Sequence, residues 1–272
     1  MPSPDEQTVT RTGFPRWATF VLIGLGAGLL SGLFGVGGGT VIVPALVAFA
    51  AFDRRMAAGT SLLAIVPTSI VGFLTYGLAG HVSVLTAAIL AVGTVIGAQL
   101  GTWLLARLSQ QVLRWAFVAF VLFVAVQLFF TVPVRGGEVE MTAPLVAGLV
   151  GLGLATGVLS GLLGVGGGVV VVPAMILLFG YSDLLAKGTS LLMMIPTAIS
   201  GTIGNLRRKN LDVRAGLFVG LGACVTVTLG SRLAALLDPQ VANWLFIAFL
   251  VFLMLKTLQD IVKARRSAAP GA

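Results

Sequence analysis

The hydrophobic positions of this 272-residue chain are gathered in long stretches separated by short polar connections. Six of these stretches have a length near the ~20 residues with which a helix crosses a bilayer. They stand in two groups of three, and each group follows a longer apolar stretch that is broken by glycines, residues 17–52 and 144–179. The pattern predicts an all-α, polytopic integral membrane protein. The six ordinary stretches are 59–79, 82–106, 112–132, 188–206, 211–237 and 241–262.

Three consecutive glycines interrupt each of the two longer stretches. Glycine permits left-handed backbone and close approach of neighbours, but it weakens a helix by about 1 kcal/mol per residue. We therefore expect one helix to end near Gly35 and another to begin near Thr40, with Pro44 in its early turns, where proline disrupts a helix least. The same broken helix is expected before Pro173. The glycines are Gly37, Gly38 and Gly39 in the first stretch and Gly166, Gly167 and Gly168 in the second.

The chain repeats itself without a gap at an offset of 129 residues, so that residues 28–45 recur as residues 157–174. Pro67 matches Pro196 at the same offset, and the Gly-Thr-Ser-Leu-Leu segment at 59–63 matches the one at 188–192. Two homologous membrane repeats are the interpretation of this pattern. The predicted divisions are a tail at 1–13, repeat 1 at 14–134, a linker at 135–142, repeat 2 at 143–263 and a tail at 264–272.

Composition and charge support a membrane protein. The chain is 57% hydrophobic and 10% charged, whereas a soluble domain carries roughly 25% charged residues. The net charge of +8 does not indicate a nucleic-acid partner, because the basic residues lie between the apolar stretches, as Lys and Arg do in cytoplasmic loops. The single cysteine, Cys224, excludes an intrachain disulfide. The lipid bilayer is therefore the predicted surrounding.

The basic residues also discriminate between two topologies. If each broken stretch crosses the membrane once, the chain has eight spans, and its 17 basic residues divide 11 to 6 between the faces. If each stretch turns back at its glycines, the division is 14 to 3, with Arg135, Lys187 and Arg232 on the minor face. Because cytoplasmic segments carry the excess of Lys and Arg, we predict inverted repeats with both termini cytoplasmic. The helix over 40–52, about 20 Å long, is then a re-entrant half-helix or a thin full crossing.

The acidic residues indicate which chemistry to exclude. All nine, Asp183 included, lie in the tails, in predicted loops or at the ends of spans, and the single histidine, His81, lies in a turn. No proton relay of buried carboxylates, metal site or acid–base pair is visible. We predict no enzyme activity, no cofactor and no metal ion.

The candidate site therefore consists of neutral polar groups. Backbone amides at the start of a half-helix favour an anion, and inverted-repeat transporters place such half-helix starts near the midplane. Hydroxyls of the following spans are further candidate donors, although they are also able to bond only to their own helices, and the glycines are able to serve packing alone. The predicted substrate-binding residues are Gly37, Gly38, Gly39, Thr40, Gly166, Gly167, Gly168, Thr60, Ser61, Thr189 and Ser190, with Thr68, Ser69, Thr197 and Ser200 as further hydroxyls.

Two other groups of residues complete the candidate set. Four prolines are expected to break helices and to act in gating: Pro44, Pro67, Pro173 and Pro196. Arg232 is the basic residue deepest in a span. Its side chain either snorkels to the outer interface or attracts anions at the external mouth. Stripes of glycine at four-residue spacing, such as 24, 28 and 32 or 93, 97 and 101, predict closely packed helices.

The doubled motif GxxxGxxGVGGGxxxVP, followed by GTSL and a proline, resembles the TauE/SafE family of sulfite exporters, and the resemblance covers essentially both repeats. It implies secondary transport of small sulfur-containing anions across a bacterial inner membrane, often export of sulfite or organosulfonates by alternating access. The family is usually described as having eight spans, from which the inverted topology predicted by charge departs. The motif residues are Gly28, Gly32, Gly35, Gly37, Gly38, Gly39 and Pro44, and Gly157, Gly161, Gly164, Gly166, Gly167, Gly168 and Pro173.

Several alternatives to this function stay open at the level of sequence. They are a transporter of a small carboxylate or neutral solute, a passive anion channel and a non-transport membrane assembly. The expected partners are a small anionic substrate and the bilayer, without nucleic acid. The sequence is compatible with transport coupled to a proton and with transport that needs no coupling ion. It is also compatible with a homo-oligomer.

Overall fold

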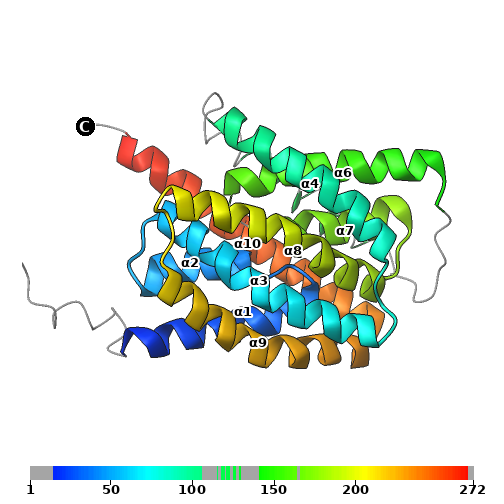
Figure 1. Ribbon diagram of the computed structural model, residues 1–272, viewed down its shortest axis with the longest axis horizontal. Coiled ribbons are helices and arrows are strands. Elements are labelled where there is room, and N and C mark those ends of the chain that lie inside the picture. Colours follow the sequence, from blue (N-terminus) through cyan, green and yellow to red (C-terminus); the bar gives the residue numbers. More distant parts are fainter. Residues whose placement is uncertain are drawn as a thin grey trace, which may run out of the picture.

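The computed structural model describes residues 15–105, 115, 118–119, 121–122, 125–126, 129, 141–163 and 166–268. This part of the chain is a bundle of α-helices (Figure 1), so the predicted all-α fold is confirmed. Six of its helices are long and apolar enough to cross a membrane. The helices are α1 (Arg16–Phe34), α2 (Gly39–Phe49), α3 (Arg54–Leu78), α4 (Val84–Leu105), α6 (Ala143–Leu163), α7 (Gly168–Phe179), α8 (Asp183–Arg207), α9 (Val213–Leu236) and α10 (Pro239–Ala268).

Most predicted spans appear as helices, with two clear shifts at their beginnings. α3 and α8 each begin five residues before the predicted stretches at 59 and 188. Polar caps explain the shift, because an oxygen that accepts from the first amides of a helix stabilises its start. Asp53 accepts from the amides of Arg55 and Met56 at 2.8 and 2.9 Å, and Ser182 accepts from Leu185. The predicted span 112–132, the linker 135–142, Arg135 and Gly164 lie wholly or largely outside the described residues.

The first broken stretch turns back at its glycines. α1 ends at Phe34, and Gly35 follows in the left-handed region with φ of 71°. A Cβ atom built on Gly38 would lie 3.4 Å from the Cβ of Ala27, halfway along α1, and the ring of Phe52 lies 5.9 Å from that of Phe20, near the start of α1. α2 therefore returns from the middle of α1 toward its beginning. With 11 residues it is about 16 Å long, a half-helix shorter than a membrane crossing.

The second broken stretch makes the same hairpin. A Cβ atom on Gly167, just before α7, would lie 2.7 Å from Cγ2 of Thr156, which is in the middle of α6. A Cβ atom on Gly148, near the start of α6, would lie 2.7 Å from Cε1 of Phe179, the last residue of α7. α7 thus begins beside the middle of α6 and ends beside its start.

Glycine stripes bring two pairs of helices into backbone contact, as predicted. Gly24 and Gly32 of α1 face the carbonyls of Val219 and Val227 of α9, so the two helices are parallel. The stripe of α4 packs on that of α6 in the same way, and a Cβ atom on Gly97 would lie 3.0 Å from the Cα of Gly157. Side chains longer than hydrogen at these positions would separate the helices.

α3 and α8 cross at the centre of the bundle and are antiparallel. A Cβ atom on Gly59, at the start of α3, would lie 3.1 Å from the Cβ of Asn205 near the end of α8, and one on Gly188 would lie 2.8 Å from the Cβ of Tyr76. The bounds of α3 recur in α8 at the offset of 129 residues. Helices at matching positions of the two halves therefore run in opposite directions, and α2 and α7 lie toward opposite ends of the bundle (Figure 1).

Basic residues gather at one end of the bundle. α1, α3 and α9 begin at this end, and α8 ends there. Two contacts show this: Gly59 of α3 lies against the carbonyl of Asn210, between α8 and α9, and the loop before α3 contacts the start of α1. We call this the basic end, and it is on the left in Figure 1. Its basic residues include Arg16, Arg55, Arg207, Arg208, Lys209 and Arg214.

Candidate functional site

The two glycine segments, residues 35–39 and 166–168, meet in the interior of the bundle. A Cβ atom on Gly168 would lie 2.7 Å from the carbonyl oxygen of Gly35 and 2.8 Å from the Cα of Val36. Val36 is 1% exposed, so the meeting point is closed off from the surface of the bundle. Only a residue without a side chain permits this approach of two backbones. We call the two segments the glycine loops.

The backbone of the loops requires glycine. Gly37, Gly38, Gly166 and Gly167 have φ of 70°, 76°, 81° and 84°, in the left-handed region that disfavours other residues. Apolar side chains from the crossing of α3 and α8 border the loops: a Cβ atom on Gly166 would lie 3.2 Å from Cδ1 of Ile65. The glycines therefore serve a tight turn as well as packing.

Each loop ends in the N-terminus of a half-helix. Gly38 and Gly167 are the N-cap residues of α2 and α7, and neither helix start has a side-chain cap. The first amides of an α-helix have no partner within the helix and carry the positive end of its dipole. Two positive helix ends thus point into the centre of the bundle from opposite sides.

Buried hydroxyls without a hydrogen-bond partner accompany both helix starts. Five buried hydroxyls in the described residues have this property, those of Ser31, Thr40, Ser69, Thr156 and Thr202. Thr40 and Thr156, 6% and 0% exposed, are the two at the half-helix starts. Thr40 is the second residue of α2, and Thr156 reaches α7 from α6, with its Cγ2 near Gly167. At the matching positions of the other half the chain has Val169 and Ala27. Each half-helix start therefore has one hydroxyl that lacks the partner a buried polar group normally has.

The hydroxyls that the sequence predicted are divided among different places. Ser190 contacts a glycine loop, because its Oγ lies 2.6 Å from the carbonyl oxygen of Gly35 and donates to it or to the carbonyl of Lys187. Ser61 donates to the carbonyl of Ala58 in its own helix at 2.9 Å. Thr68 likewise bonds within α3.

Thr60 and Thr189 lie away from the loops, at opposite ends of the bundle. Thr60 accepts from the backbone amide of Asp212, just before α9, at 3.1 Å. Thr189 accepts from the amide of Ser83, just before α4, at 3.0 Å. Both hydroxyls hold a loop in place in the structure, and their predicted part in substrate binding stays a prediction.

The four predicted prolines lie inside helices, Pro44 in α2, Pro67 in α3, Pro173 in α7 and Pro196 in α8. Their gating role stays a prediction. Arg232 is exposed on α9, one turn before its end at Leu236. Its side chain is on the outside of the bundle, which suits an interfacial residue, and anion entry at this position also stays a prediction.

A buried ion pair corrects one expectation from the sequence. Asp183 and Lys187 were expected in an external loop, whereas the structure places both in the first turns of α8, 3% and 2% exposed. Their charged atoms, Oδ2 and Nζ, lie 3.4 Å apart. The Cα of Lys187 would lie 2.6 Å from a Cβ atom on Gly35. The sequence indicated a centre without charged groups, whereas the structure has a buried ion pair beside one glycine loop.

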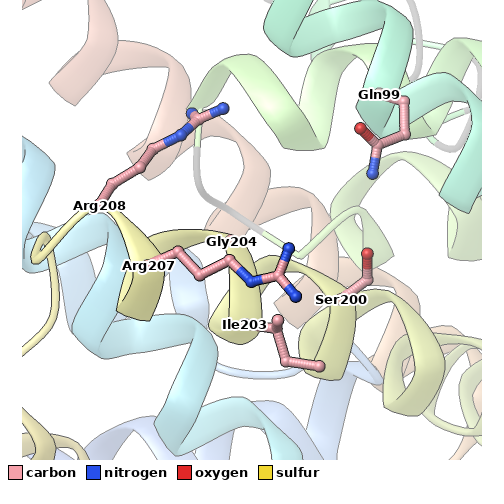
Figure 2. A pocket seen from close by; sticks show the side chains of 6 residues that line it. All are labelled: Gln99, Ser200, Ile203, Gly204, Arg207 and Arg208. Carbon is pink, nitrogen blue, oxygen red and sulfur yellow. The ribbon is translucent and has the colours of Figure 1, made fainter.

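A second feature that sequence reasoning missed is a cavity between α4 and α8 at the basic end (Figure 2), lined by Gln99, Ser200, Ile203, Gly204, Arg207 and Arg208. From the sequence, Arg207 and Arg208 count only among the basic charges that predict the topology. The available signal was the repeat itself, since Leu78 has the position in repeat 1 that Arg207 has in repeat 2. Within the described residues no three His, Cys, Asp or Glu side chains are grouped as metal ligands.

Six apolar helices of membrane-crossing length, packed with two half-helices whose starts meet, indicate a multi-pass membrane protein. Comparison with known proteins confirms the family resemblance: residues 149–271 match the family described as "Sulfite exporter TauE/SafE". The second half of the chain is thus similar to the TauE/SafE membrane transporters.

Individual relatives extend the similarity to most of the chain. The "Probable membrane transporter protein YunE" of Bacillus subtilis is 26% identical over 236 residues, which are 78% of this chain and 86% of the relative. A second protein of that organism, "Probable membrane transporter protein YdhB", is 25% identical over 218 residues, 79% of this chain and 89% of the relative. A "Probable membrane transporter protein" of Haemophilus influenzae is 29% identical over 160 residues, 56% of this chain and 60% of the relative. No solved structure matches the chain.

Proposed function

We propose that this chain is a secondary transporter that carries a small anion between its two glycine loops by alternating access. The observation that supports this most is the meeting of two uncapped half-helix starts, each with a buried hydroxyl that has no partner, Thr40 at α2 and Thr156 at α7. Donors without acceptors and two positive dipole ends suit a compact anion with several oxygens.

The magnitudes favour an anion as the missing partner. A helix N-terminus stabilises a negative charge by about 0.3–1 kcal/mol, and up to ~2 kcal/mol in a partly buried site. A hydrogen bond to a charged group contributes about 1.5–3 kcal/mol, whereas a buried hydroxyl left unpaired costs about 1–3 kcal/mol. Two helix ends and two hydroxyls together suffice for weak, reversible binding, which a transporter needs in order to release its substrate.

Alternating access is supported by the directions of the helices. α3 and α8 hold matching positions in the two halves and are antiparallel, as inverted repeats require. We infer that the two halves are inverted repeats and that they rock about the glycine loops. The basic end is proposed to be cytoplasmic, since cytoplasmic segments carry the excess of Lys and Arg, and the membrane to be a bacterial inner membrane.

The proposed substrates are sulfite or an organosulfonate, and the proposed direction is export. The geometry supports an anion, and the family description supports sulfur. A transporter of another small anion and a passive anion channel are the competing functions, and flux separates all three.

The test is flux in proteoliposomes with sulfite, thiosulfate, sulfoacetate, taurine and acetate, with and without a pH gradient. Saturable movement of one sulfur anion is expected. Saturable movement of acetate alone would replace the substrate, and flux that follows voltage without saturation would identify a channel. Absence of all flux from folded protein would overturn the proposal.

A further inference from the structure

The cavity between α4 and α8 is lined by two arginines, by Gln99 and Ser200, and by Ile203 and Gly204. Its volume is about 320 Å³, and none of the described residues that line it is acidic. Figure 2 shows the guanidinium of Arg207 extending along α8 toward Ser200, with the side chain of Gln99 on the other side of the cavity. All three side chains offer hydrogen-bond donors, and a guanidinium matches the oxygens of a carboxylate, sulfonate or phosphate group.

From Ser200, which lines the cavity, α8 continues toward a glycine loop. One turn beyond Ser200 is Thr197, whose Oγ1 lies 2.9 Å from the Oγ1 of Thr94 on α4. One turn further is Met193, whose Cε lies 4.0 Å from the position of a Cβ atom on Gly167. Ser200 and Met193 are seven positions apart, which is about 10 Å of helix. The contact between Thr94 and Thr197 thus stands between the cavity and the start of α7.

The matching helices at the opposite end are closed at the same positions. α3 and α9 correspond to α8 and α4 at the offset of 129 residues, and Thr75 and Thr228 correspond to Gly204 and Gln99. The Oγ1 atoms of Thr75 and Thr228 are 3.4 Å apart, so these two helices remain in contact where α4 and α8 enclose a cavity. The chain is therefore open between one helix pair and packed between its counterpart.

We propose that this cavity is the vestibule through which a small anion passes between the basic end and the glycine loops, with Arg207 as the residue that attracts it. The structure is then a state in which the vestibule opens to the basic end while the contact between Thr94 and Thr197 closes its inner end. The opposite state has α3 and α9 apart and α4 and α8 together. The inference rests on the proposed transport function and adds the entry path, the attracting residue and the conformational state. A cation at the mouth of a cavity raises the local anion concentration and the rate of association.

The headgroup of an anionic lipid offers the same chemistry as a soluble anion, so the test separates them. The KM for sulfite flux is measured for Arg207→Gln at low salt in liposomes of phosphatidylcholine alone and with phosphatidylglycerol. Arg214→Gln, which removes an equal charge from the exposed start of α9, is the matched control. The expected result is a KM raised about tenfold for Arg207→Gln in both lipids, with unchanged Vmax, and a difference that shrinks as salt is added. An effect confined to phosphatidylglycerol would show a lipid site and overturn the proposal.

Accessibility provides a measurement that does not depend on flux. Ser200→Cys and its counterpart Val71→Cys, both in a Cys224→Ala background, are treated with a membrane-impermeant maleimide from each side. Ser200→Cys is expected to react from the basic end alone and to be protected by sulfoacetate, which does not consume the reagent, while Val71→Cys is expected to stay unreactive from both sides.

The outcomes separate this inference from the function on which it rests. If the wild-type protein transports an anion while Arg207→Gln matches Arg214→Gln, or Ser200→Cys stays unreactive, the vestibule is refuted and the transport function stands. If folded wild-type protein moves no anion, the function is refuted, and the anion-attracting role of Arg207 with it, even where Ser200→Cys is labelled.

Discussion

Replacing Thr156 by valine should stabilise the empty protein and weaken its binding of the anion. The hydroxyl of Thr156 is fully buried and has no partner, and a buried unpaired hydroxyl costs about 1–3 kcal/mol. Valine keeps the shape and removes that group, so we expect the free energy of unfolding to rise by about 1 kcal/mol. In the proposed complex this hydroxyl would donate to a charged oxygen, a bond of about 1.5–3 kcal/mol, so affinity should fall roughly 10- to 150-fold.

Two assays on the same purified protein measure the opposite signs. Thermal unfolding in detergent, without and with the anion, gives the stability of the empty state and the stabilisation by ligand, and flux in proteoliposomes gives the KM. Thr257→Val is the control, because the Thr257 hydroxyl donates to the Leu253 carbonyl at 2.9 Å in α10; it should leave the KM unchanged. A Thr156→Val protein that is less stable and has an unaltered KM would refute the reasoning, since the hydroxyl would then be structural.

Two further substitutions test the packing around the site. Lys187→Met removes the cation that lies 3.4 Å from the buried Asp183 carboxylate and should lower the free energy of unfolding by about 3–5 kcal/mol, most of which Asp183→Asn in the same chain restores. Thermal unfolding measures both variants, and a double variant as unstable as the single one would exclude the ion pair as the cause. Gly28→Leu should prevent folding, because the leucine side chain would meet the backbone of α9. Gly26→Leu should fold normally, since nothing lies within 4 Å of a Cβ atom at that position. Size-exclusion chromatography distinguishes the two variants, and equal profiles would contradict the close packing of α1 on α9.

The broken helices were predictable from sequence because glycine acts locally. Three adjacent glycines allow positive φ wherever they occur, and the excess of basic residues favoured a turn at this point over a crossing. The predicted ends near Gly35 and Thr40 agree within a residue with the end of α1 at Phe34 and the start of α2 at Gly39. The glycine stripes were equally predictable, since small residues at four-residue spacing lie on one face of a helix.

Contacts between distant segments were not predictable in this way. Thr156 has the appearance of an ordinary helical threonine, and only the hairpin of α6 and α7 brings it to Gly167. The sequence around Asp183 and Lys187 has the pattern of a charged loop, because it adjoins a polar connection. In the structure the Ser182 cap extends α8 over both residues, and packing against Gly35 buries them. Such residues depend on tertiary neighbours that periodicity and composition do not contain.

The most direct measurement locates the anion itself. Selenite is the selenium counterpart of sulfite and scatters X-rays anomalously, so crystals of the transporter grown with selenite would reveal its position. The account predicts an anomalous peak between the glycine loops, within hydrogen-bond distance, about 2.7–3.2 Å from oxygen to donor, of the amides that begin α2 and α7 and of the hydroxyls of Thr40 and Thr156. Anomalous density at other positions alone, in protein that transports selenite, would contradict it.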